Sequence, residues 1–210
     1  MRKPVTSLVL LLGAAAWLNA STVVRLSFSQ LSTLAQRVEA GRIERITSYH
    51  DPSSGRIMSR IEIAPWRPLG ANAAPAPLSL EMTGGAVGDL RQWIAGFPNL
   101  QVGDRVVLFL AGDTSTPLGP TVGLWQGIFF IATDPATGAD IITDHRRRPV
   151  VGIENDELVL GQAPGEAGAP GARPLPIPPV RQAGAGPLTL NSFLGRVQAL
   201  RAASAAAAKR

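Results

Sequence analysis

The sequence predicts a mainly β protein, built as an antiparallel barrel or sandwich between a short N-terminal helix and a C-terminal helix. Three observations lead to this prediction. Short apolar segments with alternating polarity recur between clusters of turn residues, as they do in barrels and sandwiches. A Pro- and Gly-rich stretch separates these segments from an apolar helical pattern near the end. The 210 residues include no cysteine, so the β core has to be stable through burial alone.

The first twenty residues have the layout of a secretory signal peptide. Arg2 and Lys3 precede an apolar run from Val5 to Trp17, and Ala20 is a small residue suited to cleavage. The alternative, an uncleaved membrane anchor, is less favoured because a bilayer span needs about 20 apolar residues. No later segment of the sequence is long and apolar enough to span a membrane. We expect residues 1–20 to be removed and the protein to be exported, to the periplasm or to the medium.

Composition and charge argue against a nucleic-acid partner. The formal net charge is +5, and arginine greatly outnumbers lysine. The basic residues are scattered along the chain, apart from the run Arg146 to Arg148. A nucleic-acid reader would gather them on one face and often add stacking aromatic side chains, whereas this chain has a single tyrosine.

The first element of the mature chain is predicted to be a short helix that lies against a sheet. Ser27 is a suitable N-cap, and the apolar positions after it follow the i, i+3, i+4, i+7 spacing of a helix face. These positions are Phe28, Leu31, Leu34, Ala35 and Val38.

A β-hairpin is predicted next. Ile43 and Ile46 begin its first strand, and the residues from Asp51 to Gly55 are of types that favour a turn. In that turn Pro fixes φ, Asp and Ser bond the backbone, and Gly permits positive φ. Alternate apolar positions from Ile57 to Ile63 then continue at period two. The pattern is lost afterwards in a Pro- and Ala-rich loop from Ala64 to Pro77.

Further strands are predicted at intervals set by turn residues. Leu78 to Met82 alternates again, and Arg105 to Leu110 is predicted as a central strand that is buried on both faces. The remaining predicted strands are Leu90–Ile94, Val122–Leu124 paired with Ile128–Thr133, Ile141–Ile142, and a final hairpin of Val150–Ile153 with Leu158–Leu160.

Three segments are expected after the signal peptide. Residues 21–162 form the β domain, residues 163–188 an extended and partly polyproline linker, and residues 189–210 an amphipathic helix. Thr189 is the predicted cap of this helix, which is expected to run to about Ala207. We expect its apolar face to dock loosely or to bind a partner. That face consists of Phe193, Leu194, Val197 and Leu200.

Asp140, Asp144 and His145 form the best candidate cluster for metal binding or metal-dependent hydrolysis. Carboxylates and imidazole can bind a cation, but the spacing fits no known loop, and strand alternation places His145 opposite both carboxylates. An ordinary ion pair of Asp144 with Arg146 or Arg147 explains the same residues. The chain has no cysteine and no Gly-x-Ser-x-Gly motif, so we predict no catalytic residue, no metal and no cofactor.

The candidate contact residues are one tryptophan and the basic run. Trp66, Trp93 and Trp125 could line a ligand groove, although tryptophans are more often found at corners of the core. Trp66, which lies between prolines, is the one expected to be exposed. The run Arg146 to Arg148 has the charge to contact an anionic surface such as lipid head groups. A solvated charge run before Pro149 is the commoner explanation.

Several segments are similar to a group of uncharacterised exported bacterial β-domain proteins. In that group a short helix precedes a strand of the V-x-G-x-V type, at the place where this chain has Val38 to Ile43. A G-[ED]-x-V-x-L-F-L strand corresponds to Gly103–Leu110, and a G-x-x-Q-G-x-[FY] strand corresponds to Gly123–Phe129. The resemblance covers about Ser21 to Val159, and it implies a shared structure without any catalytic residue to carry over.

More remotely, a helix followed by a meandering Greek-key barrel is similar to netrin-like domains, the fold of tissue metalloproteinase inhibitors, and to OB folds. This resemblance implies an OB-like or netrin-like barrel. Inhibition through an N-terminal cysteine is excluded because the chain has no cysteine. A fold alone does not specify a function.

The sequence favours an exported, non-catalytic interaction module that binds another envelope or secreted protein. The hypothesis rests on the small supply of catalytic groups and on the linker that carries an apolar helix. Two alternatives remain open. One is a metal-dependent hydrolase that uses Asp140, Asp144 and His145, and the other is a protein that associates with anionic surfaces through Arg146 to Arg148.

Overall fold

The computed structural model describes residues 23–69, 77–112, 118–162 and 186–208. The predicted signal peptide and nearly all of the predicted linker lie outside these ranges. Within them the protein is mainly antiparallel β sheet with a helix near each end, as predicted. No helix in this part of the chain combines the length and apolar character needed to cross a membrane.

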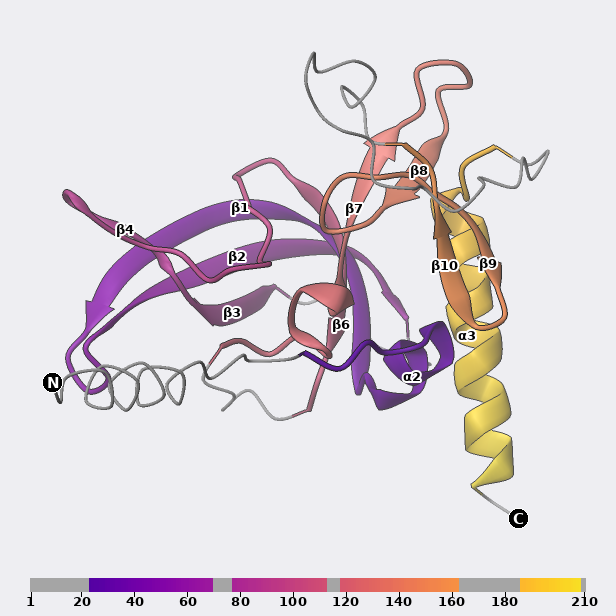
Figure 1. Cartoon of the computed structure of the whole chain (residues 1–210), viewed down its shortest axis with the longest axis horizontal. Helices are drawn as coiled ribbons and strands as arrows, with labels where there is room; N and C mark the ends of the chain where they lie inside the picture. The colour runs from indigo at the N-terminus through magenta and orange to yellow at the C-terminus, as the bar shows by residue number, and fades with distance from the viewer. Residues whose placement is uncertain (1–22, 70–76, 113–117, 163–185, 209–210) are drawn as a thin grey trace, which may run out of the picture.

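A six-stranded antiparallel sheet in the order β3-β2-β1-β6-β7-β8 forms the body of the protein (Figure 1). Two small hairpins, β4–β5 and β9–β10, are added to it. The strands are β1 (Arg37–Asp51), β2 (Arg56–Leu69), β3 (Leu78–Thr83), β4 (Gly85–Val87), β5 (Leu90–Gln92), β6 (Arg105–Leu110), β7 (Ile128–Thr133), β8 (Asp140–Thr143), β9 (Val150–Glu154) and β10 (Glu157–Leu160).

Two helices pack against one face of this sheet, α2 (Phe28–Leu34) and α3 (Leu190–Ala207). The Ser27 side chain caps α2 by accepting a hydrogen bond from the backbone N–H of Gln30. Thr189 caps α3, and α3 ends at the predicted residue. Figure 1 shows α3 beside the β9–β10 hairpin, at the end of the molecule opposite the tip of β1 and β2.

The two longest strands, β1 and β2, bend across the molecule and form one long hairpin (Figure 1). β6 pairs only with Arg37 to Arg42 of β1, whereas β3 pairs with Met58 to Ile63 of β2. The edge strands β3 and β8 therefore lie at different ends of the long strands. Since β3 and β8 are the two edges and are not paired with each other, the described part of the sheet is open and does not form a closed barrel, which was one of the two predicted architectures.

The sheet is buried on both faces. One core lies between the sheet and the two helices, and the other lies on the opposite face, among residues of β2, β3, β6 and β7. β6 contributes Val107 and Phe109 to the first core and Val106 and Leu108 to the second. The prediction of a central strand buried on both faces is confirmed.

Two predicted boundaries are wrong in the first half of the chain. α2 ends at Leu34, and Val38 belongs to β1 instead of to the helix. β2 continues to Leu69 through the segment predicted as a loop, because it pairs there with β1. The prolines of this segment are tolerated since β3 reaches only Ile63, so that they interrupt no ladder on that side of β2.

The predicted strand at Val122–Leu124 is also wrong. Gly123 and Leu124 have positive φ angles of 62° and 61°, in the left-handed region that ends an extended strand. A short 3-10 helix, η2 (Leu124–Gly127), follows and leads directly into β7. The strand predicted at Leu90–Ile94 is limited to the three residues of β5.

Candidate functional site

The acidic cluster predicted at residues 140–145 is divided between separate environments. Asp144 is 4% exposed and organises the turn after β8, where its Oδ1 accepts two backbone N–H groups. Its Oδ2 forms an ion pair with Arg148 Nη2 at 2.7 Å. The predicted pair with Arg146 or Arg147 is wrong, because the turn returns the guanidinium of Arg148 to the carboxylate.

Asp140 belongs to a different network. Its Oδ1 lies 2.9 Å from Arg105 Nη1, and Arg105 Nη2 donates to Thr133 Oγ1 at 2.9 Å. Across the described ranges, no group of three or more His, Cys, Asp or Glu side chains is placed to hold a metal ion. The geometry therefore gives no support to a metal-dependent hydrolase centred on Asp140 and Asp144.

His145 lies at the edge of an open pocket of about 420 Å³ between α2, η2 and β10. Its ring is half buried, with its centroid 6.4 Å from that of Trp125. Burial lowers the pKa of His145, although Asp144 acts in the opposite direction, so that the imidazole is neutral near pH 7. The described side chains that line the pocket include no serine, threonine or cysteine for this imidazole to activate.

The basic run Arg146 to Arg148 is mostly engaged within the chain. Arg147 places its guanidinium carbon 3.4 Å from the ring centroid of Phe130 and donates to both carboxylate oxygens of Asp104 at 3.0 Å. Arg148 pairs with Asp144, as described above. Arg146 is exposed and has no ionic partner among the described residues. One free charge therefore remains instead of three.

The apolar face of α3 is packed in the chain's own core. Phe193, Leu194 and Val197 are buried, and Leu200 packs against the same core. The ring centroid of Phe193 lies 5.1 Å from that of Phe129 in β7. Of the two predicted alternatives, docking on the β domain is the one that the packing of these side chains supports.

The three tryptophans of the described ranges all retain solvent exposure. Trp66 is 40% exposed, which confirms the predicted exposure, although it lies in β2 and not in a loop. Trp93 is 66% exposed, and Trp125 is partly exposed with an edge contact to Phe97 at 5.9 Å. Trp93 therefore does not occupy a corner of the core, and both tryptophans line surface pockets, the other alternative that the sequence offered.

An apolar groove lies between the sheet and the segment Gly84–Leu100. This segment is anchored to Ile57 of β2, where Gly84 N–H donates to the Ile57 carbonyl at 2.8 Å. The N–H of Ile57 donates in turn to Gln92 Oε1 at 2.7 Å. At Gly85 the segment approaches the sheet so closely that a Cβ would lie 2.4 Å from two serine hydroxyl oxygens. Glycine is therefore needed there to bring the segment onto the sheet.

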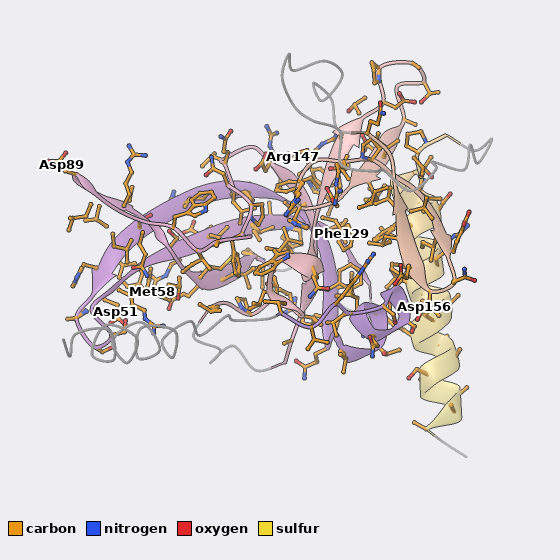
Figure 2. All side chains as sticks on the ribbon, viewed as in Figure 1. Asp51, Met58, Asp89, Phe129, Arg147 and Asp156 are labelled. Carbon is orange, nitrogen blue, oxygen red and sulfur yellow. The ribbon has the colours of Figure 1, made fainter. Side chains whose placement is uncertain are left out.

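The groove has a volume of about 380 Å³ and Trp93 at its mouth. Figure 2 shows Asp89 at the outer end of the β4–β5 hairpin, which projects from the body of the protein. Leu90, the next residue, is 64% exposed. Arg91 is the one charged side chain among the described residues that line the groove. Its main apolar lining residues are Ile46, Ile61, Met82, Ile94, Phe97 and Leu100.

Sequence reasoning did not locate this groove because its walls come from β1, β2, β3 and the segment Gly84–Leu100, in which β4 and β5 are only three residues long. A signal was nevertheless present. Trp93, Ile94 and Phe97 bring large apolar side chains into a stretch that has no sustained strand alternation. Large apolar residues outside regular elements indicate either a satellite core or an exposed patch. The structure shows that this stretch supplies both.

Comparison of the chain with known protein families, with curated proteins and with solved structures finds no match. The role of each pocket therefore has to be argued from its own chemistry. Of the pockets described, the groove under Gly84–Leu100 combines the size of a ligand site with exposed aromatic and aliphatic side chains.

Proposed function

We propose that this protein is an exported, non-catalytic binding module and that the groove under Gly84–Leu100 is its binding surface. The observation that supports this most directly is the exposure of Trp93, which lines an apolar hollow, together with the exposure of Leu90 in the adjoining strand β5. Exposed large apolar side chains beside a hollow are typical of interaction sites. Their place on a segment anchored to β2 favours a preformed surface, which binds a partner without a large cost in ordering.

Burial of Trp93 by a partner would supply a substantial part of the binding free energy. A fully buried aromatic side chain removes about 150 to 250 Å² of surface from water, and 66% of Trp93 is still exposed. At about 25 cal/mol per Å², covering that remainder is worth about 2 to 4 kcal/mol. Trp93 is therefore the expected energetic centre of the interface.

The chemistry of the groove fits an extended apolar segment of another envelope or secreted protein. The hydroxyl groups of Ser48 and Ser59 bond to each other at 2.9 Å, and Ser59 also donates to the carbonyl of Gly84 at 2.7 Å. These polar groups therefore require nothing from a ligand. Arg91 gives the groove a positive charge, so the partner segment should carry an acidic residue beside its apolar side chains.

Two observations support binding over catalysis. Asp140 and Asp144 are both held in ion pairs with arginines, and the pocket of His145 offers no nucleophile among its described lining residues. Association with anionic surfaces through the basic run is less favoured, because Arg147 and Arg148 already have acidic partners.

Export and kinship are part of the same proposal. The pattern of residues 1–20 supports cleavage after Ala20, and the motifs at Gly103–Leu110 and Gly123–Phe129 support kinship with the exported bacterial β-domain group. A remoter netrin-like or OB-like relationship rests on the order of helix and antiparallel strands alone. N-terminal sequencing of the protein recovered from periplasm and medium should give Ser21 as the first residue. Recovery of the intact N-terminus in the membrane fraction would contradict the proposal of export with cleavage.

Site-specific photocrosslinking tests the groove. The full chain is expressed in a bacterial host with its own first twenty residues, and a photoreactive amino acid replaces Leu90. In the control chain it replaces Leu34, which is 59% exposed on α2 and lines no part of the groove. Illumination should join one exported protein to position 90 and not to position 34.

Two further variants make the result specific. Trp93→Ala should remove the crosslinked product, whereas Leu34→Ala should leave it unchanged, because only Trp93 belongs to the groove. The crosslinked peptide of the partner should be apolar and carry an acidic residue. A product that persists in Trp93→Ala, or equal products from positions 90 and 34, would show that the groove is not the binding surface.

A further inference from the structure

Trp66 is directed into a different pocket by an irregularity in β2. The pairing of β1 with β2 places Gly41 opposite Pro65 and Ala40 opposite Arg67, so that Trp66 has no partner residue on β1. Such a bulge bends the strand and re-aims the side chain of the extra residue. Trp66 lines an open pocket of about 490 Å³, a volume within the range of small-molecule sites.

Four segments that are distant in sequence form the walls of this pocket. They are Ala40 of β1, Trp66 of β2, residues 138–140 at the start of β8, and residues 189–191 at the start of α3. The last two are joined, because Ile142 N–H donates to the carbonyl of Leu188 at 3.0 Å. Strand and helix backbone therefore hold the pocket walls in place.

Arg105 positions both the indole and the carboxylate of the pocket. Its guanidinium carbon lies 5.9 Å from the ring centroid of Trp66, and its Nη1 donates to Asp140 Oδ1 at 2.9 Å. Arg105 is not among the residues that line the pocket, and Trp66 is 40% exposed. The contacts of the Asp140 carboxylate with Arg105 and Thr133 are made through Oδ1, and its side chain is 39% exposed.

We infer that this pocket binds a neutral pyranose sugar. A pyranose ring has an apolar C–H face that can lie against an indole, and hydroxyl groups at its edge that can donate to a carboxylate oxygen. The pocket presents both groups, Trp66 on one wall and Asp140 on another.

The charges and polarity of the pocket argue against the other classes of small ligand. Arg105 balances the charge of Asp140, so the pocket offers no net charge to attract a strongly ionic ligand. A wholly apolar ligand would take the Asp140 carboxylate out of water without giving it a hydrogen bond. A neutral ring that is apolar on one face and hydroxylated at its edge meets both conditions.

Titration with free sugars tests this inference. The full chain is titrated with glucose, galactose, mannose and N-acetylglucosamine, and with glucuronic acid as a charged comparison, and binding is followed by calorimetry and NMR. We expect saturable binding of at least one neutral sugar with a dissociation constant of about 1 mM, since one aromatic ring in an open pocket supplies most of the contact. Absence of saturable binding by every neutral sugar, or tighter binding of glucuronic acid, would overturn the inference.

Four variants test whether sugar binding depends on residues of this pocket and not on other parts of the surface. Trp66→Ala should weaken binding at least about tenfold, as expected for an aromatic anchor, and Trp66→Phe should restore part of the affinity. Asp140→Asn should weaken binding by a smaller factor, while Leu34→Ala on α2 should leave it unchanged. Equal affinities of the parent and Trp66→Ala would overturn the inference, and thermal melts establish that each variant is folded. The crosslinking result at Leu90 does not depend on these titrations, so the two proposals can fail separately.

Discussion

Phe193 connects α3 to the rest of the protein, and its substitution measures how firmly this helix is docked. Its side chain is fully buried, with ring centroids 5.3 Å from Phe28, 6.2 Å from Phe109 and 5.1 Å from Phe129. Phe193→Ala removes these contacts and leaves a cavity among aromatic rings. Such a substitution lowers the free energy of unfolding by about 3 to 5 kcal/mol. That loss is a large share of the roughly 5 to 15 kcal/mol by which native domains are stable.

Urea unfolding of the full chain, followed by circular dichroism, measures this effect. With a slope of about 2 kcal/mol per M, Phe193→Ala should lower the unfolding midpoint by about 2 M. Gln198→Ala, at an exposed position of the same helix, is the control and should change the free energy of unfolding by less than about 0.5 kcal/mol. Equal midpoints for the two variants would mean that α3 is not part of the core, and the reasoning from its buried face would be refuted.

Two further predictions concern a helix interior and a hairpin turn. A Cβ at Gly195 of α3 would have no atom within 4 Å, so Gly195→Ala should raise the free energy of unfolding by about 0.5 to 1 kcal/mol, seen as a higher Tm. The hydroxyl groups of Ser27 and Ser29 lower the pKa of Asp156. Its carboxylate therefore stabilises the fold fully above the unfolded-state pKa of about 4, and this contribution is lost as the pH falls through the lower folded-state pKa. The difference in stability between the parent and Asp156→Asn should be constant near neutral pH and shrink below about pH 4, and a difference that persists in strong acid would contradict this assignment.

The elements that the sequence predicts well are those whose signals are local. The turn at Asp51–Gly55 is stabilised by its own residues, since the Asp51 carboxylate accepts hydrogen bonds from Ser53 and Ser54. The strand Arg105–Leu110 needs only an unbroken apolar run to indicate burial on both faces. α3 is defined by its cap Thr189 and by apolar residues at helical spacing. In each case the deciding residues lie within or next to the element.

The docking surface of α3 and the length of β2 could not be predicted from the sequence, because both depend on contacts between distant parts of the chain. The apolar spacing of α3 shows that one face is buried, but it does not show against which surface. The answer depends on contacts such as those of Arg201, which donates to the carbonyl oxygens of Ser32 and Gln36 at 3.1 and 3.0 Å. Likewise, β2 runs through Pro65 because pairing with β1 outweighs the local preference for a loop.

The candidate sites could be predicted only in part, for the same reason. The exposure of Trp66 follows from the prolines around it, but its direction follows from the bulge opposite Gly41, which depends on the register of β1 and β2. The exposure of Trp93 depends on how the segment after Gly85 is drawn onto the sheet, and that requires the serine pair beneath it. Neither register nor close approach can be read from composition or periodicity.

Gln126 has a structural role in the segment Gly123–Phe129. Its side-chain oxygen accepts the N–H of Leu26 at 2.8 Å, and its side-chain nitrogen donates to the carbonyl of Val24 at 2.9 Å. The amide thus bonds to the backbone of the segment that follows the predicted cleavage site. Gln126 accordingly holds the backbone of Val24 and Leu26 to the β domain.

Gly127, the next residue, is also required for a structural reason. A Cβ at Gly127 would lie 2.5 Å from the carbonyl oxygen of Val122, which is backbone and cannot move aside cheaply. Residues whose roles are structural specify an architecture and carry no information on function. We therefore expect the proposed binding to depend on side chains outside this segment, above all on the exposed Trp66 and Trp93.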